Sequence, residues 1–347
     1  MLVPAQIRSL VEFAIAAQAS DLHLSAGVPP IVRVFGSIRA VPGWDKLAPD
    51  DIKAMLSPLL TDTQRSQLEE RGQVDLSFGV QGLGRFRCNI SKQRGSWALA
   101  LRVISSTIRS LEDLGLPEIL HDLAHLRDGL ILVTGPTGSG KSTTLAAMID
   151  IINRERQGVI ITLEDPIEFL HHHKKCVVNQ REVGTDTTSF ADGLRAALRS
   201  DPDVILVGEM RDLETIAIAL TAAETGHLVL STLHTRGAAK TIDRIIDVFP
   251  PESQHQIRVQ LSTVLEAVIS QQLLPRKDAR GMVPAVEVMV GTPAIRNMIR
   301  EEKVHQIPAM IETGARFGMQ TMKAAVEELI RKGLVDESAL FRRENFS

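Results

Sequence analysis

One glycine-rich turn, within residues 129–144, constrains the fold of this chain more than any other feature. A short apolar run with the length of a buried strand leads directly into it. Gly135 then precedes Gly140-Lys141-Ser142 by four intervening residues, which is the G-x-x-x-x-G-K-[ST] spacing of a P-loop. Because such a loop joins a buried strand to a helix, the spacing predicts an α/β fold around a phosphate-binding turn.

The residue types of this loop suit a triphosphate. Its glycines let the backbone wrap closely around phosphate groups, so that N–H groups and the next helix's N-terminus point at negative charge. Lys141 adds a cation for the β- and γ-phosphates, and the Ser142 hydroxyl can complete a Mg²⁺ shell. A glycine turn with no ligand is the alternative, and the full spacing argues against it. The predicted nucleotide-binding residues are Gly135, Pro136, Thr137, Gly138, Ser139, Gly140, Lys141, Ser142 and Thr143.

Composition limits the class of protein. With 347 residues, 44% of them hydrophobic and 23% charged, the chain can bury a large core and divide into two domains. A formal net charge of −3 argues against a general polyanion binder. Tyrosine is absent, and two tryptophans and ten phenylalanines offer little surface for stacking bases, which argues against a nucleic-acid motor.

Cysteine content and apolar runs bear on location. Cys88 and Cys176 are far apart and form no Cys-x-x-Cys pair, so neither a disulfide framework nor a cysteine zinc site is expected, and a reducing cytoplasm fits. The N-terminal apolar segment contains Glu12 and does not follow the pattern of a signal peptide. No apolar run approaches the roughly 20 residues that span a bilayer, so any membrane role is expected to be peripheral.

The pattern along the chain predicts an α+β domain, a linker and an α/β core. In the first domain we expect helices over residues 4–18 and within 50–70, with Asp50 and Thr61 at helix starts, and strands near 23–34, 74–78, 85–90 and 96–104. Strands and helices then alternate as in a parallel sheet, and residues 250–275 and 292–346 are expected to be mostly helical. The predicted domains are residues 1–108, a linker at 109–117, the core at 118–290 and a helical region at 291–347.

Polar residues follow three buried strands of the expected core. Since ligands of open α/β sheets bind at the carboxyl ends of strands, these residues are candidates for chemistry. The acidic box from Glu164 to Glu168 suits Mg²⁺ or an attacking water, and Glu209 occupies the position of a catalytic carboxylate. Gly208 stands where an aspartate is usual, which moves the metal-binding role towards Glu164 or Asp165. His227 and His234 bracket the last of these strands.

Each of these assignments has a structural alternative. Carboxylates after strands often cap helices, and a histidine is often structural. The triplet His171-His172-His173 could bind a metal adventitiously, but it precedes two lysines and is expected to be a solvated loop. Phosphoryl transfer also needs more positive charge than one lysine supplies. Arg87 and Arg102, on neighbouring predicted strands, are the candidates, with an ordinary sheet surface as the alternative.

Four segments in order resemble the secretion-superfamily P-loop ATPases of type II and type IV secretion, and most closely the branch that retracts type IV pili. The segments are the P-loop, Glu164-Asp165-Pro166-Ile167-Glu168, Gly208-Glu209-Met210-Arg211-Asp212, and Thr225-Gly226-His227 through Leu233-His234-Thr235. They match that family's Walker A, Asp box, Walker B and His box. Further support comes from residues 20–24, 178–183 and 294–299.

The resemblance implies a PAS-like N-terminal domain and a RecA-like core, assembled into a cytoplasmic homohexamer with ATP and Mg²⁺ between the domains. It implies that Glu209 activates water, that Glu164 assists with Mg²⁺, and that Arg87 and Arg102 neutralise the γ-phosphate. The ring would act on an inner-membrane pilus platform protein, and so indirectly on the pilus fibre, to power retraction and twitching motility. The segment of residues 294–299 is expected to form a helix with an apolar stripe that either packs on the core or couples the motor to its partner.

Three other functions are weighed against this one. A pilus-assembly or type II secretion ATPase usually has a larger N-terminal region and a four-cysteine zinc motif, and this sequence contains only two cysteines. A nucleotide-gated scaffold without turnover fits poorly with the carboxylates at the strand ends. A nucleic-acid motor is disfavoured by charge and aromatic content.

Overall fold

The computed structural model describes residues 3–34, 36–104, 107–278 and 281–341, which form two compact units. The first unit comprises the chain up to Thr107 together with Glu168–Leu170, and the second comprises Ile108–Ile167 and the chain from His171 onward. All of the residues expected to be a linker, 109–117, belong to the second unit, and they include helix α4 (Leu111–Leu114). Residues 105–106 of the connection lie outside the described residues.

The first unit is an α+β domain around a six-stranded antiparallel sheet. The strands follow the order β3-β2-β1-β6-β5-β4. Its helices are α1 (Ala5–Ala16), α2 (Pro49–Leu56) and α3 (Asp62–Arg71), with the 3₁₀ turn η1 (Ser57–Leu59), and its strands are β1 (Asp21–Leu24), β2 (Ile31–Val34), β3 (Ser37–Ala40), β4 (Gln73–Val80), β5 (Gly84–Gln93) and β6 (Ser96–Ile104). Arg94 and Gly95 both have positive φ, which suits the two-residue turn between β5 and β6.

Two details of this unit differ from the sequence prediction. Asp50 does not cap α2: the helix begins after Ala48, whose N–H donates to Asp51 Oδ2 at 2.9 Å. Thr61 caps α3 as predicted, accepting from the N–H of Gln64. Strand β3 was not predicted, because its residues are exposed and show no alternation of burial.

The second unit contains a seven-stranded sheet in the order β13-β12-β7-β11-β10-β8-β9. All neighbouring pairs are parallel except β12 with β13. The strands are β7 (Gly129–Thr134), β8 (Gly158–Glu164), β9 (Cys176–Glu182), β10 (Val204–Val207), β11 (Leu228–Leu233), β12 (Leu265–Pro275) and β13 (Met282–Val290). The helices are α4, α5 (Ile119–Ala124), α6 (Lys141–Glu155), α7 (Phe190–Ala197), α8 (Leu213–Glu224), α9 (Ala238–Asp247), α10 (Pro251–Val264), α11 (Pro293–Arg300), α12 (Ile307–Thr313) and α13 (Met322–Arg331), with the 3₁₀ turns η2 (Val304–Gln306), η3 (Ala315–Phe317) and η4 (Glu337–Phe341).

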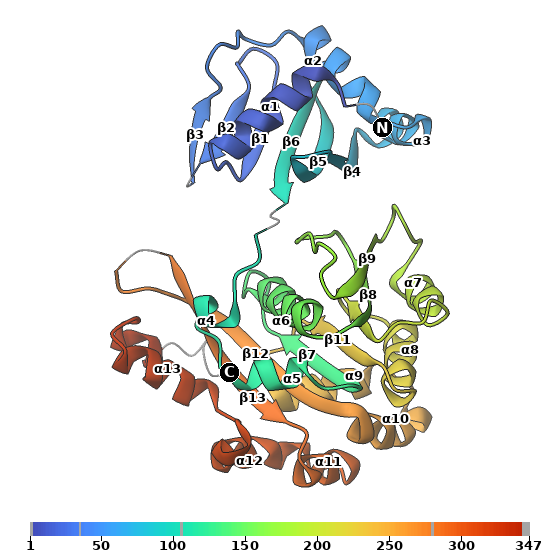
Figure 1. The fold of residues 1–347 in the computed structure, drawn as a ribbon, viewed down its shortest axis with the longest axis vertical. Helices are drawn as coiled ribbons and strands as arrows, with labels where there is room; N and C mark the ends of the chain where they lie inside the picture. The colour runs from blue at the N-terminus through green and yellow to red at the C-terminus, as the bar shows by residue number, and fades with distance from the viewer. Residues whose placement is uncertain (1–2, 35, 105–106, 279–280, 342–347) are drawn as a thin grey trace. The chain divides into compact units, whose positions relative to one another are not determined.

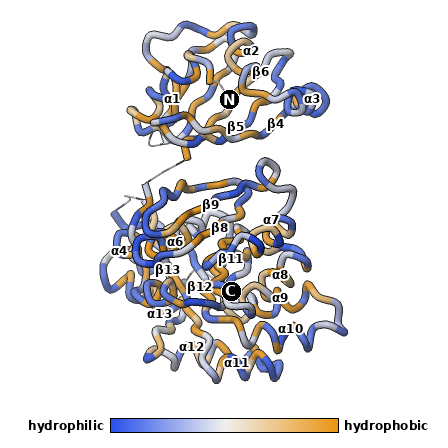
Figure 2. Tube along the Cα trace, turned by 45° about the vertical axis from the view of Figure 1, so that its right-hand side comes forward, coloured by the Kyte–Doolittle hydropathy of each residue, from blue (hydrophilic) through white to orange (hydrophobic). Residues whose placement is uncertain are grey.

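Helices cover both faces of this sheet (Figure 1). Along β7, Leu130 and Leu132 pack in a core with helices α7 to α12, whereas Ile131 and Val133 pack in a second core with α4, α5 and α6. All of β7 is buried, as a central parallel strand requires. The outer helices alternate hydrophobic and hydrophilic residues, as the tube shows for α10 (Figure 2). This is the P-loop α/β core that the sequence predicts.

The prediction of helix across residues 250–275 is wrong in its second half. Helix α10 ends at Val264, and the next residues form β12, which lies between β7 and β13. Most of β12 is buried, so apolar residues occur on both of its faces and give no strand-like alternation in the sequence. Strand β13 was missed for the same reason. No helix of the described residues is both long and apolar enough to cross a bilayer.

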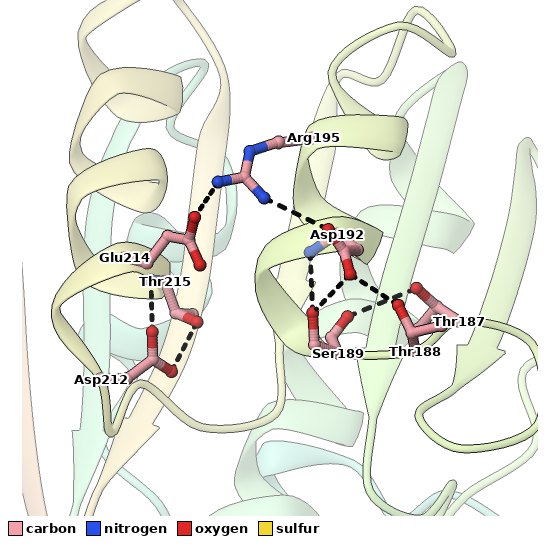
Figure 3. Close-up of polar contacts among 8 residues, drawn as sticks. All are labelled: Thr187, Thr188, Ser189, Asp192, Arg195, Asp212, Glu214 and Thr215. Atoms are coloured by element: carbon pink, nitrogen blue, oxygen red, sulfur yellow. Dashed lines mark hydrogen bonds and ion pairs between the residues drawn. The ribbon is translucent and has the colours of Figure 1, made fainter.

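Two capped helices, α7 before β10 and α8 after it, contact each other (Figure 3). Ser189 accepts from the N–H of Asp192 at the start of α7, and Asp212 accepts from the N–H of Thr215 at the start of α8. Arg195 of α7 forms ion pairs with Asp192 and with Glu214 of α8. These contacts fix where the chain turns away from the sheet, and they make Asp212 a helix cap.

Candidate nucleotide site

The P-loop joins β7 to α6 at the carboxyl edge of the sheet. Gly135, Gly138 and Gly140 all have positive φ, which a side chain would strain. A Cβ on Gly135 would lie 2.2 Å from the carbonyl oxygen of Gln271, so only glycine fits there. Among the described residues no side chain caps the N-terminus of α6, which leaves its first N–H groups to bind an anion.

Lys141 is the first residue of α6, and its side chain folds back over the loop. Its Nζ donates to the carbonyl oxygens of Gly135 at 2.9 Å and Pro136 at 3.1 Å. Lys141 is only 8% exposed. The ammonium group is thus already held where the loop turns, next to the amides that a phosphate would meet.

Gln271 on β12 braces the P-loop and was not predicted from the sequence. Its Nε2 donates to the carbonyl oxygen of Ser139 at 2.8 Å, and its Oε1 accepts from the hydroxyl of Thr144 at 2.7 Å. The side chain is only 2% exposed, so both contacts are made away from water. Gln271 could not have been found by sequence, because its segment was read as helix and a brace across the sheet has no local signal.

A cavity of about 470 Å³ lies beside the first turn of α6. Loop and helix residues Gly140, Thr143 and Thr144 form one side, and its apolar lining comes from distant parts of the chain: Leu114, Leu116, Leu273, Met282, Val283, Pro284 and Leu334. Arg109 and Arg276 also line it. A cavity with a mixed apolar and polar lining next to a phosphate loop suits the base and ribose of a nucleotide.

Glu209 and His234 meet at the same edge of the sheet. β11 lies between β7 and β10, so His234, which follows β11, lies between the P-loop after β7 and the Glu209 that follows β10. His234 Nε2 lies 3.6 Å from Glu209 Oε2, and His234 Nδ1 lies 3.5 Å from the Thr137 hydroxyl of the P-loop. Arg211 pairs with Glu209 at 2.7 Å. The structure thus brings the predicted carboxylate, histidine and phosphate loop together.

Glu164 ends β8, on the far side of β10 from β11. Its Oε1 accepts from the hydroxyl of Thr162 at 2.6 Å and from Gln180 Nε2 at 3.0 Å. These donors fix the orientation of the carboxylate. Asp165 follows it and is exposed. Glu164 and Asp165 are therefore at the carboxyl edge of the sheet, at the end of β8, which is the third strand away from β7.

Close packing explains the glycine at position 208. A Cβ at this position would lie 3.1 Å from the carbonyl oxygen of Leu163, at the end of neighbouring β8. The Gly208 N–H donates to that same oxygen at 2.7 Å. Glycine lets the two strand ends approach closely, which fits the absence of the usual aspartate.

His227 lies apart from these groups. It precedes β11, so it is at the amino edge of the sheet, whereas the P-loop is at the carboxyl edge. Its Nδ1 lies 2.9 Å from the carbonyl oxygen of Ala222 and 3.2 Å from the Thr225 hydroxyl, at the end of α8. Within this chain, His227 and His234 therefore lie at opposite ends of β11, as expected of two residues that bracket a strand. A strand of six residues separates them.

The histidine triplet is more structural than the predicted solvated loop. Burial lowers the pKa of His171 to about 4, and the His173 ring accepts from the N–H of Val178 at 3.0 Å. The carbonyl oxygen of His172 accepts from Asn153 at 2.7 Å. These contacts anchor the segment to α6 and β9.

Arg87 and Arg102 lie directly opposite each other on β5 and β6 of the first unit, and both are exposed. Asp21 on β1 is in turn opposite Arg102, and their side chains pair at 3.0 Å. Burial acts to raise the pKa of Asp21, but hydrogen bonds from Ser20 and Arg102 outweigh it and hold the pKa below its ordinary value. Since like charges directly opposite in a sheet repel, the arginine pair suits an anion.

Comparisons with known proteins agree with this geometry. Residues 62–283 match the family described as type II/IV secretion system protein. The chain is 52% identical over 329 residues to the type IV pilus retractation ATPase PilT of Pseudomonas aeruginosa, covering 95% of each chain. It is 49% identical over 314 residues to a twitching motility protein of Neisseria gonorrhoeae, covering 90% of this chain and 84% of that one.

A solved structure is equally similar. The crystal structure of the pilus retraction motor PilT with bound ADP superposes with a TM-score of 0.89 at 51% identity, covering 96% of this chain and 95% of the other. The match to the family extends over the P-loop, both acidic strand ends and His234. By its sequence, its fold and the arrangement of this site, the chain belongs to the type II/IV secretion system protein family.

Proposed function

We propose that this chain is an ATPase that converts ATP hydrolysis into retraction of type IV pili. The observation that carries the proposal is the contact of His234 with both Glu209 and the P-loop residue Thr137, because it joins a water-activating group to a phosphate site. The similarity to proteins described as a pilus retraction ATPase and a twitching motility protein supports the cellular role. We further propose that it acts as a cytoplasmic homohexamer at the pilus base, peripheral to the inner membrane, on the platform protein.

The phosphates of ATP would bind the P-loop amides and Lys141, while its base and ribose would enter the cavity of about 470 Å³. The uncapped start of α6 supports this orientation. Ser139 and Thr144, held by Gln271, shape the loop between these two parts.

The donors for Mg²⁺ are hard oxygen atoms, which is what this ion prefers. We assign them to the hydroxyl of Ser142 and the carboxylates of Glu164 and Asp165, of which Glu164 is already oriented by Thr162 and Gln180. When bound, the ion neutralises charge on the β- and γ-phosphate oxygens.

Glu209 would accept a proton from the water that attacks the γ-phosphorus, as the bond to the β-phosphate bridging oxygen breaks and ADP leaves. His234 would orient Glu209 and sense the phosphate through the P-loop. Arg87 and Arg102 would supply positive charge to the transferring phosphoryl group. His227, at the opposite edge of the sheet, would take a structural role in its own chain.

Phosphate release by the purified protein tests turnover. Wild type is expected to release phosphate from ATP, and Lys141→Ala is expected to lose both ATP binding and release, while Lys323→Ala, on the exposed face of α13, behaves as wild type. Binding of ATP by wild type without phosphate release would instead favour the nucleotide-gated scaffold.

Pilus imaging tests the direction of work. Deleting the gene in its host is expected to leave abundant pili that extend and do not retract. Absence of pili after deletion would contradict retraction and favour an assembly or secretion ATPase.

A further inference from the structure

Three side chains outside the nucleotide site converge at the far end of the P-loop helix. His121 and His125 lie one turn apart on α5 and its C-cap, so both rings are on one face, with ring centroids 4.6 Å apart. Glu155, the last residue of α6, reaches both: its Oε2 is 2.8 Å from His125 Nε2 and its Oε1 is 3.5 Å from His121 Nε2. One ligand atom from each lies within 4.8 Å of the others.

Hydrogen bonding fixes which nitrogen of His125 faces the carboxylate. Its Nδ1 lies 2.8 Å from the carbonyl oxygen of His121. A carbonyl oxygen only accepts, so Nδ1 carries a proton, and in a neutral ring Nε2 then presents a lone pair. That lone pair would face the oxygen of Glu155. The arrangement therefore calls for a positive charge between the two groups.

The position of Glu155 calls for the same charge. A helix of 15 residues ends at Glu155, and its C-terminus carries the negative end of the helix dipole. A carboxylate there is unfavourable unless a cation compensates it. The basic residue of the last turn, Arg154, pairs with Asp150, so among the described residues the two histidines are the groups that contact Glu155.

We propose that His121, His125 and Glu155 form a binding site for Zn²⁺. A tetrahedral zinc ion holds nitrogen and oxygen ligands at about 2.0–2.1 Å, which separates neighbouring ligand atoms by about 3.3 Å. The two histidine–carboxylate separations in the structure, 2.8 Å and 3.5 Å, lie on either side of this value. Imidazole ligands favour zinc over Mg²⁺, and the fourth position is left for water.

All three side chains are half-exposed, so a dissolved ion can reach them. Zinc here would tie α5, which leads into β7, to the end of α6, which begins at Lys141. These segments are already joined where Arg156 donates to the carbonyl oxygen of Leu126 at 2.8 Å. The ion would thus hold together α5, which precedes β7, and α6, which follows the P-loop, at a position away from the phosphates.

Calorimetric titration of the chelator-treated, nucleotide-free protein with Zn²⁺ tests the site. Wild type is expected to bind one equivalent tightly, and His121→Ala, His125→Ala and Glu155→Gln are each expected to weaken binding at least tenfold. The melting temperature of wild type is expected to rise until one equivalent is bound, and that of His125→Ala to stay constant. Millimolar Mg²⁺ is expected not to compete.

Two control variants locate the ion. His255→Ala, on the exposed face of α10, is expected to bind zinc as wild type does. Loss of binding in His172→Ala with retention in His121→Ala would place the ion at the histidine triplet and overturn the proposal. No tight binding by wild type would also overturn it and leave these three residues as an ion-paired cluster.

Discussion

His234 Nε2 lies 3.6 Å from Oε2 of Glu209, although 24 residues and helix α8 separate the two strand ends in sequence. The contact exists because β10 and β11 are parallel neighbours, so that their carboxyl ends meet. His234 also reaches the P-loop, since β11 neighbours β7 on its other side. A movement of the P-loop at the phosphates can therefore be transmitted to Glu209 through the imidazole ring of His234.

Glu209→Gln is expected to retain ATP binding and to lower phosphate release at least about a hundredfold, because the amide cannot accept the proton from water. Nucleotide affinity by calorimetry and phosphate release measure the two effects separately. Glu252→Gln, an exposed residue at the start of α10, serves as the matched control. Rapid turnover by Glu209→Gln would transfer the base role to Glu164.

Replacements of His234 and His227 are expected to have different effects on turnover and stability. His234→Ala should lower turnover at least about tenfold with little change in ATP affinity, since it orients a group that acts in the transition state. His227→Ala should instead lower the melting temperature, because its ring contacts the end of α8, and leave turnover per folded protein nearly unchanged. Lost turnover with unchanged stability in His227→Ala would restore His227 to the catalytic set.

Gln271→Leu is expected to weaken ATP binding and to lower the free energy of unfolding by about 1–3 kcal/mol, because the Ser139 carbonyl and Thr144 hydroxyl lose a buried partner. The adjacent Gln272→Leu is a suitable control, since that side chain lines a different cavity. ATP titration and denaturant unfolding measure both effects. Wild-type affinity in Gln271→Leu would show that the loop keeps its shape without this brace.

Much of this site could be predicted from the sequence because its signals are local. The P-loop spacing and the polar residue after each apolar run identify Lys141, Glu209 and His234 without knowledge of strand order. Gln271 and the cavity lining could not be predicted in this way, because they depend on β12 lying beside β7 and on residues of the expected linker. The apolar residues of β12 face both ways in a buried strand, and such a pattern does not distinguish strand from helix.

The arginine pair of the first unit, Arg87 and Arg102, is expected to act in turnover, and replacement of Asp21 is the comparison. Arg87→Ala and Arg102→Ala are each expected to lower turnover at least about tenfold with little effect on ATP affinity, as for charges that act on the transition state. Asp21→Asn frees Arg102 from its ion pair and should change turnover in the opposite direction or not at all. Wild-type turnover in both arginine variants would make them an ordinary sheet surface.

The same ion pair predicts a dependence of stability on pH. Because folding lowers the pKa of Asp21 below its ordinary value, its ionised form stabilises the folded unit at pH values above that ordinary pKa, and the contribution is lost as the pH falls through the lowered folded-state pKa. Since Arg102 is exposed, the contribution is expected to be no more than about 1 kcal/mol. The difference in unfolding free energy between wild type and Asp21→Asn should be present near neutral pH and vanish in acid, and a constant difference would contradict the linkage.

The apolar stripe expected on helix α11 has a buried part and an exposed part. Ile295 and Ile299 are fully buried in the core and Met298 packs against it, whereas Ala294 and Asn297 are exposed. Arg296 is an anchor, since it pairs with Glu266 at 2.6 Å and donates to the carbonyl oxygen of Gly291 at 2.7 Å. Replacement of Ile295 is therefore expected to harm the fold, and a surface of this helix that couples to a partner must use the exposed residues.

We accordingly expect Ile295→Ala to lower the free energy of unfolding by about 2–5 kcal/mol, and ATPase activity and retraction to fall together. Ala294→Glu combined with Asn297→Glu is expected to leave folding and phosphate release near wild type and to abolish retraction, because both side chains are exposed and Asn297 hydrogen-bonds to the exposed Glu301. Melting temperature, phosphate release and pilus imaging on the same variants separate the two cases. Normal retraction by the double variant would show that the exposed face of this helix does not transmit the work of the motor.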